Sequence, residues 1–321
     1  MYLHNHKDFK NLIEISAAKN TISNPFLVEK DYWIMHCLHN LSCLGLKLEL
    51  KGGTSLSKGY GIVHRFSEDI DVKIVPEENI IGFKVYTGRN QDKEKQRQSR
   101  KNYFDWLAKE LQDKIDGIVS VTRDEHRDDK KFRRGAITLG YKSHFTSVKG
   151  IREGVLLEIG FDETVPNKKR DITSWVFEEG YSILGCLLTD NRAKKLACYD
   201  PRYTFVEKLQ TIVSRYSSYK KGTNGTDLPG NFLRHYYDIY CLLGLEEVLK
   251  FIRTDEYRDY KKKHFRNHDT NIKNCAGFSL PDAKERQAFM NKYRASSSLY
   301  YKGQISFDAI LKRIEQYLHI L

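Results

Sequence analysis

The stretch KGGTSLSKGYGIVHRFSEDIDVKI, residues 51–74, decides how this chain is interpreted. It places Gly52 and Gly53 directly after a short apolar strand. Because glycine has no Cβ, backbone N–H groups can approach an anion closely here, and a helix starting at this point directs its positive end toward the same place. Thr54 and Ser55 add hydroxyl donors. Alone, such a glycine pair is often only a tight turn.

The second half of the stretch contains a pair of acids. Asp69 and Asp71 are two residues apart on an expected strand, 69–75, so both side chains lie on one face. Neighbouring carboxylates repel each other unless a cation lies between them, and Mg²⁺ binds through carboxylates and substrate phosphates. An exposed strand edge also accounts for an Asp-x-Asp pattern. Together with the glycine pair, however, the acids predict a site for Mg²⁺, with Mn²⁺ as the alternative, and for a nucleoside triphosphate.

A third acid would complete the group of metal ligands. Glu158 lies within the apolar segment GVLLEIGF, where an unpaired carboxylate would be costly to bury. We therefore predict Glu158 as the third ligand, although an outward-facing position on a half-exposed strand is the ordinary alternative. Asp162, four residues later, is the reserve candidate.

Composition narrows the class of protein and its partners. The chain has 321 residues, a hydrophobic fraction of 40% and a net charge of +12. This is enough apolar material for one or two folded domains, and the positive charge favours a polyanionic partner such as RNA, although a merely charged surface is an equal alternative. No apolar run is long enough to cross a membrane, and the beginning MYLHNHKDFK is unlike a signal peptide, so we expect no membrane partner and a cytoplasmic location. The six scattered cysteines predict neither zinc sites nor disulfides.

The hydrophobic pattern predicts an α+β fold in which a mixed β-sheet is flanked by helices and followed by a mostly helical C-terminal domain. We place the boundary near residue 195, giving domains 1–195 and 196–321. The polar segment 253–274 is expected to be a solvated surface, with RNA as one candidate to face it. The expected strands are 48–50, 69–75, 117–123, 134–142 and 153–161, the expected helices are 8–19, 26–44, 90–115, 201–216, 231–244 and 306–320, and 222–231 is an expected flexible loop.

GGTSLSKGYGIVHRFSEDIDVKI resembles the first motif of the AbiEii-type nucleotidyltransferase toxins, in the DNA polymerase β-like nucleotidyltransferase superfamily. FLVEKDYWIMHCL (26–38) is similar to the N-terminal helix of that family, TFVEKLQTIVSR (204–215) to its central lysine motif and RHYYDIYCL (234–242) to its Arg-x-x-x-Asp motif. The motifs occur in family order between residues 26 and 245, and the last 75 or so residues match no motif.

The resemblance implies a nucleotidyltransferase fold and a role for each matched residue. Ser55 and the glycines would bind triphosphate, Ser67 would lie close to the nucleotide, and Asp69 and Asp71 would bind Mg²⁺. In the C-terminal domain, Lys208 would neutralise phosphate charge and Asp238 would lie at the edge of the active site. The family often has Arg-Asp-x-x-Asp in its last motif, whereas His235 replaces the first acid here.

The residues of the later motifs are also compatible with purely structural roles. Lys208 flanks an apolar helix stripe and would more often be a surface lysine. Arg234 and Asp238 have i, i+4 spacing and could pair on one helix face. The run Glu29-Lys30-Asp31 is expected to be an ordinary charged face, with Lys30 within reach of the site.

The predicted function is transfer of a nucleoside monophosphate from a nucleoside triphosphate to an acceptor, with release of pyrophosphate. The positive charge favours RNA, and the resemblance implies the 3′ end of tRNA as acceptor and a cognate antitoxin as partner. One alternative acceptor is a protein hydroxyl, including that of Ser67. The other alternative is a non-catalytic protein that binds RNA or a partner, which Asp69 and Asp71 argue against.

Overall fold

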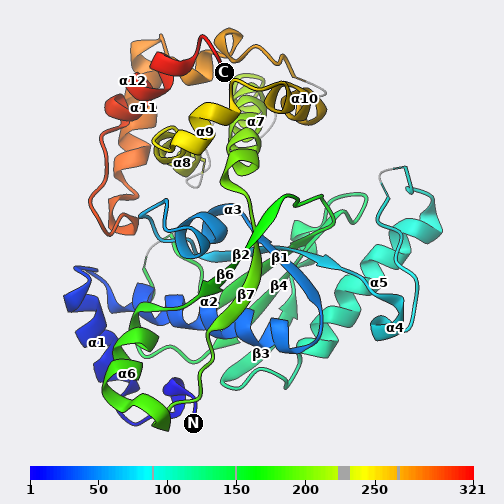
Figure 1. The fold of residues 1–321 in the computed structure, drawn as a ribbon, viewed down its shortest axis with the longest axis vertical. Coiled ribbons are helices and arrows are strands. Elements are labelled where there is room, and N and C mark those ends of the chain that lie inside the picture. The colour runs from blue at the N-terminus through cyan, green and yellow to red at the C-terminus, as the bar shows by residue number, and fades with distance from the viewer. Residues whose placement is uncertain (89, 149, 223–231, 266–267) are drawn as a thin grey trace. The chain divides into compact units, whose positions relative to one another are not determined.

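The computed structural model describes residues 1–321 apart from 89, 149, 223–231 and 266–267. Contacts divide the chain into two units, and each is described by itself (Figure 1). Unit 1 contains Met1–Gly61 and Phe66–Tyr199, and unit 2 contains Ile62–Arg65 and Asp200–Leu321. The short segment between the glycine pair and the acid pair therefore belongs to unit 2.

Unit 1 contains a seven-stranded sheet with the strand order β3-β4-β5-β2-β1-β7-β6. β1 is parallel to β7 and β2 is parallel to β5, whereas the other neighbours are antiparallel. The expected mixed sheet is thus confirmed. The strands are β1 (Lys47–Lys51), β2 (Asp69–Val75), β3 (Ile118–Arg123), β4 (Arg134–Tyr141), β5 (Val155–Gly160), β6 (Asn167–Ile172) and β7 (Ala193–Tyr199).

Helix α2 packs against four strands of the sheet, β1, β2, β5 and β7. It begins where the Asn24 side chain accepts a hydrogen bond from the N–H of Phe26 at 2.9 Å, with Pro25 in the first turn. Helices α1 and α6 pack against α2, and α5 packs against β3 and β4. The helices are α1 (Phe9–Lys19), α2 (Pro25–Cys43), α3 (Gly52–Thr54), α4 (Glu78–Ile81), α5 (Glu94–Leu111) and α6 (Trp175–Leu184).

Unit 2 is helical. Its first helix begins at Pro201, with the side chain of Asp200 accepting a hydrogen bond from the N–H of Arg202 at 2.9 Å, as the Asp-Pro pair predicts. Helix α7 packs against α8, α9 and α10, and α12 packs against α8 and α11. The helices are α7 (Pro201–Lys220), α8 (Arg234–Leu242), α9 (Glu246–Phe251), α10 (Asp255–His264), α11 (Ala283–Arg294) and α12 (Phe307–Tyr317).

Several elements were not predicted, notably β6, β7, α6 and α9 to α11. β6 reads NKKRDI and α10 reads DEYRDYKKKH, so charged residues conceal their periodicity. The expected polar surface at 253–274 does contain many exposed residues, but Lys261 is buried and donates a hydrogen bond to the carbonyl of Leu321. The expected loop at 222–231 lies almost wholly outside the described residues. Within the part of the chain that the structure describes, no helix is long and apolar enough to span a membrane.

Candidate active site

The glycine turn follows β1 and lies against the start of β2. The two strands are antiparallel, and their register pairs Lys51 with Asp71. Gly52 has a φ of +67°, and a Cβ built on it would lie 2.9 Å from Oδ2 of Asp71. Any side chain at this position would strain the backbone and collide with the carboxylate. The glycine turn and the Asp71 carboxylate are therefore in direct contact.

A buried threonine joins this turn to the acid strand. The Thr54 hydroxyl lies 2.5 Å from the carbonyl oxygen of Asp69 and 3.0 Å from the hydroxyl of Ser67. Thr54 is buried, whereas Ser67 is partly exposed. The hydroxyl of Thr54 thus fixes the start of β2 relative to the turn, and Ser67 remains the accessible hydroxyl of the pair.

Ser55 is directed into the interior of unit 1. Its side chain is fully buried, and its hydroxyl donates a hydrogen bond of 3.5 Å to the carbonyl of Tyr199. Gly52 and Gly53 are partly exposed. The part of this turn that a triphosphate can reach is therefore the glycine backbone, and contact with the Ser55 hydroxyl stays a prediction from the sequence.

The three predicted acids lie on two neighbouring strands. Asp69 and Asp71 are partly exposed and alternate with buried Ile70 and Val72, so both carboxylates lie on one face of β2. β5 runs parallel to β2, and the register places Glu158 beside Asp71. The pKa of Glu158 is raised because the group is partly buried and because the negative charge of Asp71 is close.

Two cations already contact these acids. Nζ of Lys51 lies 3.6 Å from Oδ1 of Asp71, and Nη1 of Arg127 lies 2.7 Å from Oε1 of Glu158. Neither cation was predicted as a site residue. Lys51 precedes the glycine pair and could have been found from its position, but Arg127 is distant in sequence and gives no signal. Asp162 is exposed, follows the end of β5 and pairs with Arg134 at 3.5 Å.

The residues fit a hard divalent cation in part. Carboxylate oxygens are the ligands that Mg²⁺ prefers. The negative charge of Asp71 is, after burial, the second cause that raises the pKa of Glu158, and a cation between the two groups would relieve it. In the described residues, no three His, Cys, Asp or Glu side chains converge closely enough to hold a metal ion. Mg²⁺ commonly uses one or two carboxylates with substrate phosphates and water as its other ligands. Asp69 and Asp71 can supply such a pair.

The expectation that Glu29, Lys30 and Asp31 form an ordinary charged face is wrong. All three side chains are buried on α2. Asp31 forms an ion pair with Lys58, in the π-helical turn that continues α3, and accepts a hydrogen bond from the N–H of Trp175 at 3.1 Å. A buried charge is tolerated only with such partners. Asp31 therefore anchors the segment that follows the glycine pair.

Unit 2 contains a separate charged cluster around Asp238. The Asp238 carboxylate accepts two hydrogen bonds of 2.7 Å from the guanidinium of Arg65, and Nζ of Lys208 lies 3.0 Å away. Asp238 is fully buried, and Lys208 is buried as well, so the expectation of a surface lysine is wrong. Burial opposes ionisation of Asp238, but Arg65 and Lys208 outweigh this effect and hold its pKa well below the usual range.

His235, at the position where the family often has an acid, lies in the same surroundings. It is partly buried, and its pKa is lowered by desolvation and then by the positive charge of Lys208. Its Nδ1 atom is buried without a hydrogen-bond partner in the described part of the chain. Arg65 was not predicted for this cluster, because no local pattern indicates a partner 173 residues away.

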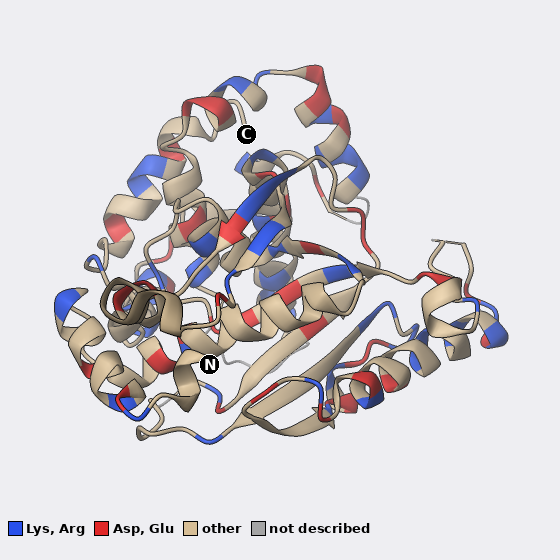
Figure 2. Cartoon of the chain, turned by 60° about the horizontal axis from the view of Figure 1, so that its bottom comes forward, with Lys and Arg blue, Asp and Glu red and all other residues tan. Residues whose placement is uncertain are grey.

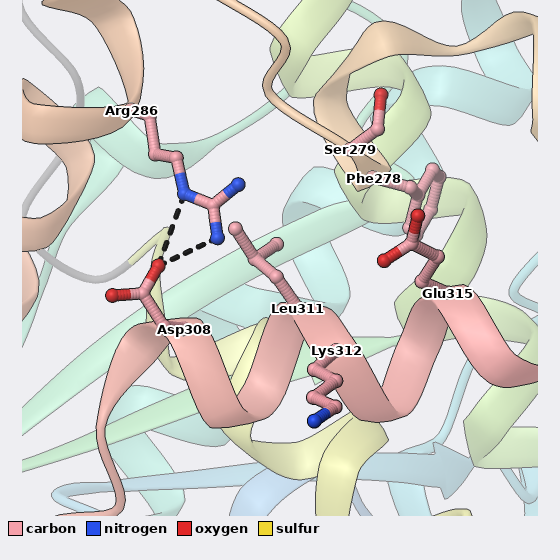
Figure 3. Close-up of a pocket in the computed structure, with 7 residues that line it drawn as sticks. All are labelled: Phe278, Ser279, Arg286, Asp308, Leu311, Lys312 and Glu315. Atoms are coloured by element: carbon pink, nitrogen blue, oxygen red, sulfur yellow. Dashed lines mark hydrogen bonds and ion pairs between the residues drawn. The ribbon is translucent and has the colours of Figure 1, made fainter. Parts of the chain in front are cut away.

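Unit 2 also contains a hollow of about 340 Å³, but none of the predicted site residues lines it. Arg286 on α11 and Asp308 on α12 point toward one another across it (Figure 3), with Nη2 of Arg286 2.6 Å from Oδ1 of Asp308. The two charges neutralise each other, so the hollow offers no unmatched charge from this pair.

Comparison with protein families agrees with the resemblance. The family model described as "Nucleotidyl transferase AbiEii toxin, Type IV TA system" matches residues 38–313. The match begins at the end of the segment 26–38 and extends through the C-terminal helices, for which no motif was predicted. The crystal structure of an antigenic nucleotidyltransferase-like protein from Paracoccidioides brasiliensis is similar at a TM-score of 0.38 and 13% identity, covering 88% of this chain and 96% of that one. A search of the curated proteins gives no match.

Proposed function

Since the chain belongs to the AbiEii family of nucleotidyl transferase toxins of type IV toxin–antitoxin systems, we propose that it transfers a nucleoside monophosphate from a nucleoside triphosphate to the 3′ end of an RNA, with tRNA as the first candidate acceptor. The observation that carries the proposal is the contact between the glycine turn and the Asp71 carboxylate, with Glu158 beside it. A backbone suited to phosphate and carboxylates suited to a cation thus meet at one place.

Different residues of unit 1 have different roles in the proposed reaction. The partly exposed glycine backbone receives the phosphates, and Asp69 and Asp71 hold the divalent cation that accompanies them. When bound there, such a cation would supply charge neutralisation and activation of the attacking hydroxyl. Thr54 keeps Asp69 in place through its backbone carbonyl, and Lys51 adds positive charge at Asp71. The role of Lys208 toward the phosphates stays a prediction.

A basic sheet edge favours RNA over a small acceptor. β6 is an edge strand on which Lys168, Lys169 and Arg170 are exposed in a row, and Figure 2 shows a strand that is blue along most of its length. The guanidinium of Arg170 lies over the ring of Tyr60, 4.8 Å from its centroid, just after the π-helical turn. Cations interleaved with aromatic rings suit a phosphate backbone with bases that can stack.

The direct test incubates the purified protein with each α-³²P-labelled nucleoside triphosphate, Mg²⁺ and total cellular RNA, and resolves the products on a denaturing gel. A labelled band of tRNA size that is absent with Asp69→Asn is the expected result. A chelator should abolish the band, and added Mg²⁺ or Mn²⁺ should restore it. Labelled RNA that persists in Asp69→Asn, or no label with folded wild-type protein, contradicts the proposal.

A protein hydroxyl is the second candidate acceptor, because one lies near the proposed site. Ser67 is partly exposed, is two residues from Asp69 and has its hydroxyl 3.0 Å from that of Thr54. The same gel distinguishes this case. Labelled protein that disappears in Ser67→Ala, without labelled RNA, identifies self-modification.

A further inference from the structure

The ammonium of Lys51 lies beside the Asp71 carboxylate that the proposed function assigns to a divalent cation, with 3.6 Å between Nζ and Oδ1. We propose that Lys51 is a nucleotide-binding residue that exchanges partners. Its ammonium pairs with Asp71 in the empty site and moves to a phosphate when the nucleotide arrives with its cation. This inference rests on the proposed function, because it adds a binding residue to the same site.

The two oxygens of the Asp71 carboxylate have different neighbours. Oδ1 is the oxygen near Lys51, whereas Oδ2 lies 2.9 Å from the place where a Cβ on Gly52 would be. The ammonium and the glycine turn are therefore neighbours of the same carboxylate. Lys51 also directly precedes Gly52 in the chain. A phosphate bound at the glycine turn thus lies within reach of the long and flexible Lys51 side chain.

The contact between Lys51 and Asp71 is looser than the ion pair in unit 2. At 3.6 Å, Nζ and Oδ1 are too far apart for a hydrogen bond, whereas Nζ of Lys208 lies 3.0 Å from Oδ2 of Asp238. The side chain of Asp71 is 34% exposed and that of Lys51 is 10% exposed. Asp71 therefore has an open side from which a divalent cation can enter, while Lys51 approaches it from the interior.

Three neighbouring strands form the place where the ammonium rests. Lys51 ends β1, Asp71 is its register partner on β2, and Nζ of Lys51 lies 4.0 Å from the place where a Cβ on Gly160 of β5 would be. A larger side chain at Gly160 would reach into this place. The pairing of β1 with β2 holds the backbone of Lys51, so its four-carbon side chain is the part that can move.

The charges at this place explain why the ammonium would change partners. A divalent cation at Asp71 repels the ammonium beside it, and the repulsion is stronger because Lys51 is buried and poorly screened by water. A triphosphate at the glycine turn supplies negative oxygens, and an ammonium pairs well with phosphate. The exchange therefore leaves neither Lys51 nor Asp71 without a counter-charge, which a buried group requires.

The test measures binding of the cation and of the nucleotide separately. Electron paramagnetic resonance gives the Kd of Mn²⁺ alone, and calorimetry at saturating Mn²⁺ gives the Kd of the α,β-methylene analogue of each of the four nucleoside triphosphates. We expect Lys51→Met to lower the Kd of Mn²⁺ alone about fivefold, because a competing charge is lost. The same variant should raise the Kd of the best-bound analogue about tenfold, because a phosphate loses its partner. A lysine with a purely structural role would not change the two constants in opposite directions.

Two further variants show whether these effects belong to the contact between Lys51 and Asp71. Lys47→Met removes a lysine from the same face of β1, four residues away, whose side chain is 67% exposed and pairs with Glu77. It should change neither Kd. Lys51→Met combined with Asp71→Asn should lose the tighter binding of Mn²⁺, because the acid that binds it is gone. Circular dichroism checks that each variant is folded.

Three results for folded Lys51→Met protein would overturn the exchange of partners. They are weaker binding of both Mn²⁺ and the analogue, tighter binding of Mn²⁺ with unchanged binding of the analogue, and no detectable binding of Mn²⁺. Unchanged binding of both, with labelled RNA formed by the wild-type protein, would reject the exchange and leave the proposed function standing. If the wild-type protein transfers no label, the proposed function fails, and the two binding constants still decide the role of Lys51.

Discussion

Asp71 in unit 1 and Asp238 in unit 2 are both paired with cations, but they differ in exposure and in the number of partners. Asp71 is partly exposed, lies 3.6 Å from Lys51 and has another acid, Glu158, beside it. Asp238 is fully buried, accepts two hydrogen bonds from Arg65 and has Lys208 3.0 Å away. The first region has acids in excess, and the second has cations in excess.

This difference in exposure and pairing distinguishes acids that can bind a cation from an acid that stabilises the fold. Acids that are accessible and close to each other can accept an additional cation. The pKa of Glu158 is raised first by burial and then by the negative charge of Asp71. An acid enclosed by an arginine and a lysine has no remaining capacity, and the lowered pKa of Asp238 reflects its satisfied charge. The comparison predicts that the acids of unit 1 control activity, whereas Asp238 controls stability.

Replacing an acid of unit 1 should have the largest effect. We expect Asp71→Asn to lower the rate of nucleotidyl transfer by at least about 10³-fold, because a charged ligand for the cation is lost at the reacting phosphates. Its free energy of unfolding should hardly change, since the side chain is partly exposed and lies in a surplus of acids. Rate assays and urea denaturation measure the two quantities. A large loss of stability would remove the distinction between the two regions.

Replacing Asp238 should act mainly on folding. Asp238→Asn leaves Arg65 and Lys208 buried without their counter-charge, which typically costs about 3–5 kcal/mol of unfolding free energy. Denaturant titration measures the loss. The matched control replaces all three residues together, as Arg65→Met, Lys208→Met and Asp238→Leu, and should recover most of the stability because it leaves none of these three charges buried without a partner. A stable Asp238→Asn protein would show that this cluster is not structural.

Replacing Glu158 tests whether the functional acids of unit 1 include a third residue besides Asp69 and Asp71. Glu158→Gln should lower the transfer rate about tenfold to a hundredfold, since it changes a group beside Asp71 rather than one of the proposed pair. Asp162→Asn is the control, because that side chain is exposed and paired with Arg134. Equal effects of the two variants would mean that the register position of Glu158 has no functional consequence.

His235 should make the stability of unit 2 depend on pH. Its folded-state pKa lies well below the ordinary histidine value of 6.5, so the unfolded chain takes up a proton near pH 6.5 and the folded chain does not. Stability is therefore full above that pH and decreases as the pH falls below it, by at most about 1.4 kcal/mol per pH unit for one proton. His235→Gln should lessen this decrease between pH 6.5 and 5. His36, whose pKa burial lowers to about 4, contributes a similar decrease in both proteins and cancels in the difference. Identical pH profiles of the two proteins would contradict the prediction.

Local patterns were sufficient for much of the core fold. Alternation identified β2 with its observed bounds, and the Asp-Pro pair identified the start of α7. The same approach failed at β6 and α10, where charged residues occupy most positions, because a strand at the sheet edge and a polar helix need few apolar residues. It also failed at Glu29, Lys30 and Asp31, whose charges suggested solvent but are buried against specific partners.

The sequence by itself determined the family, the mixed sheet and the candidate acids, because these depend on spacing along one strand or on motifs in a fixed order. Only the tertiary structure placed Glu158 beside Asp71, brought Arg65 to Asp238 and connected Lys30 to Glu68 through Arg152. Each of these contacts joins residues far apart along the chain. Their energies depend on burial and on the full set of charged neighbours, which exist only once the chain has folded.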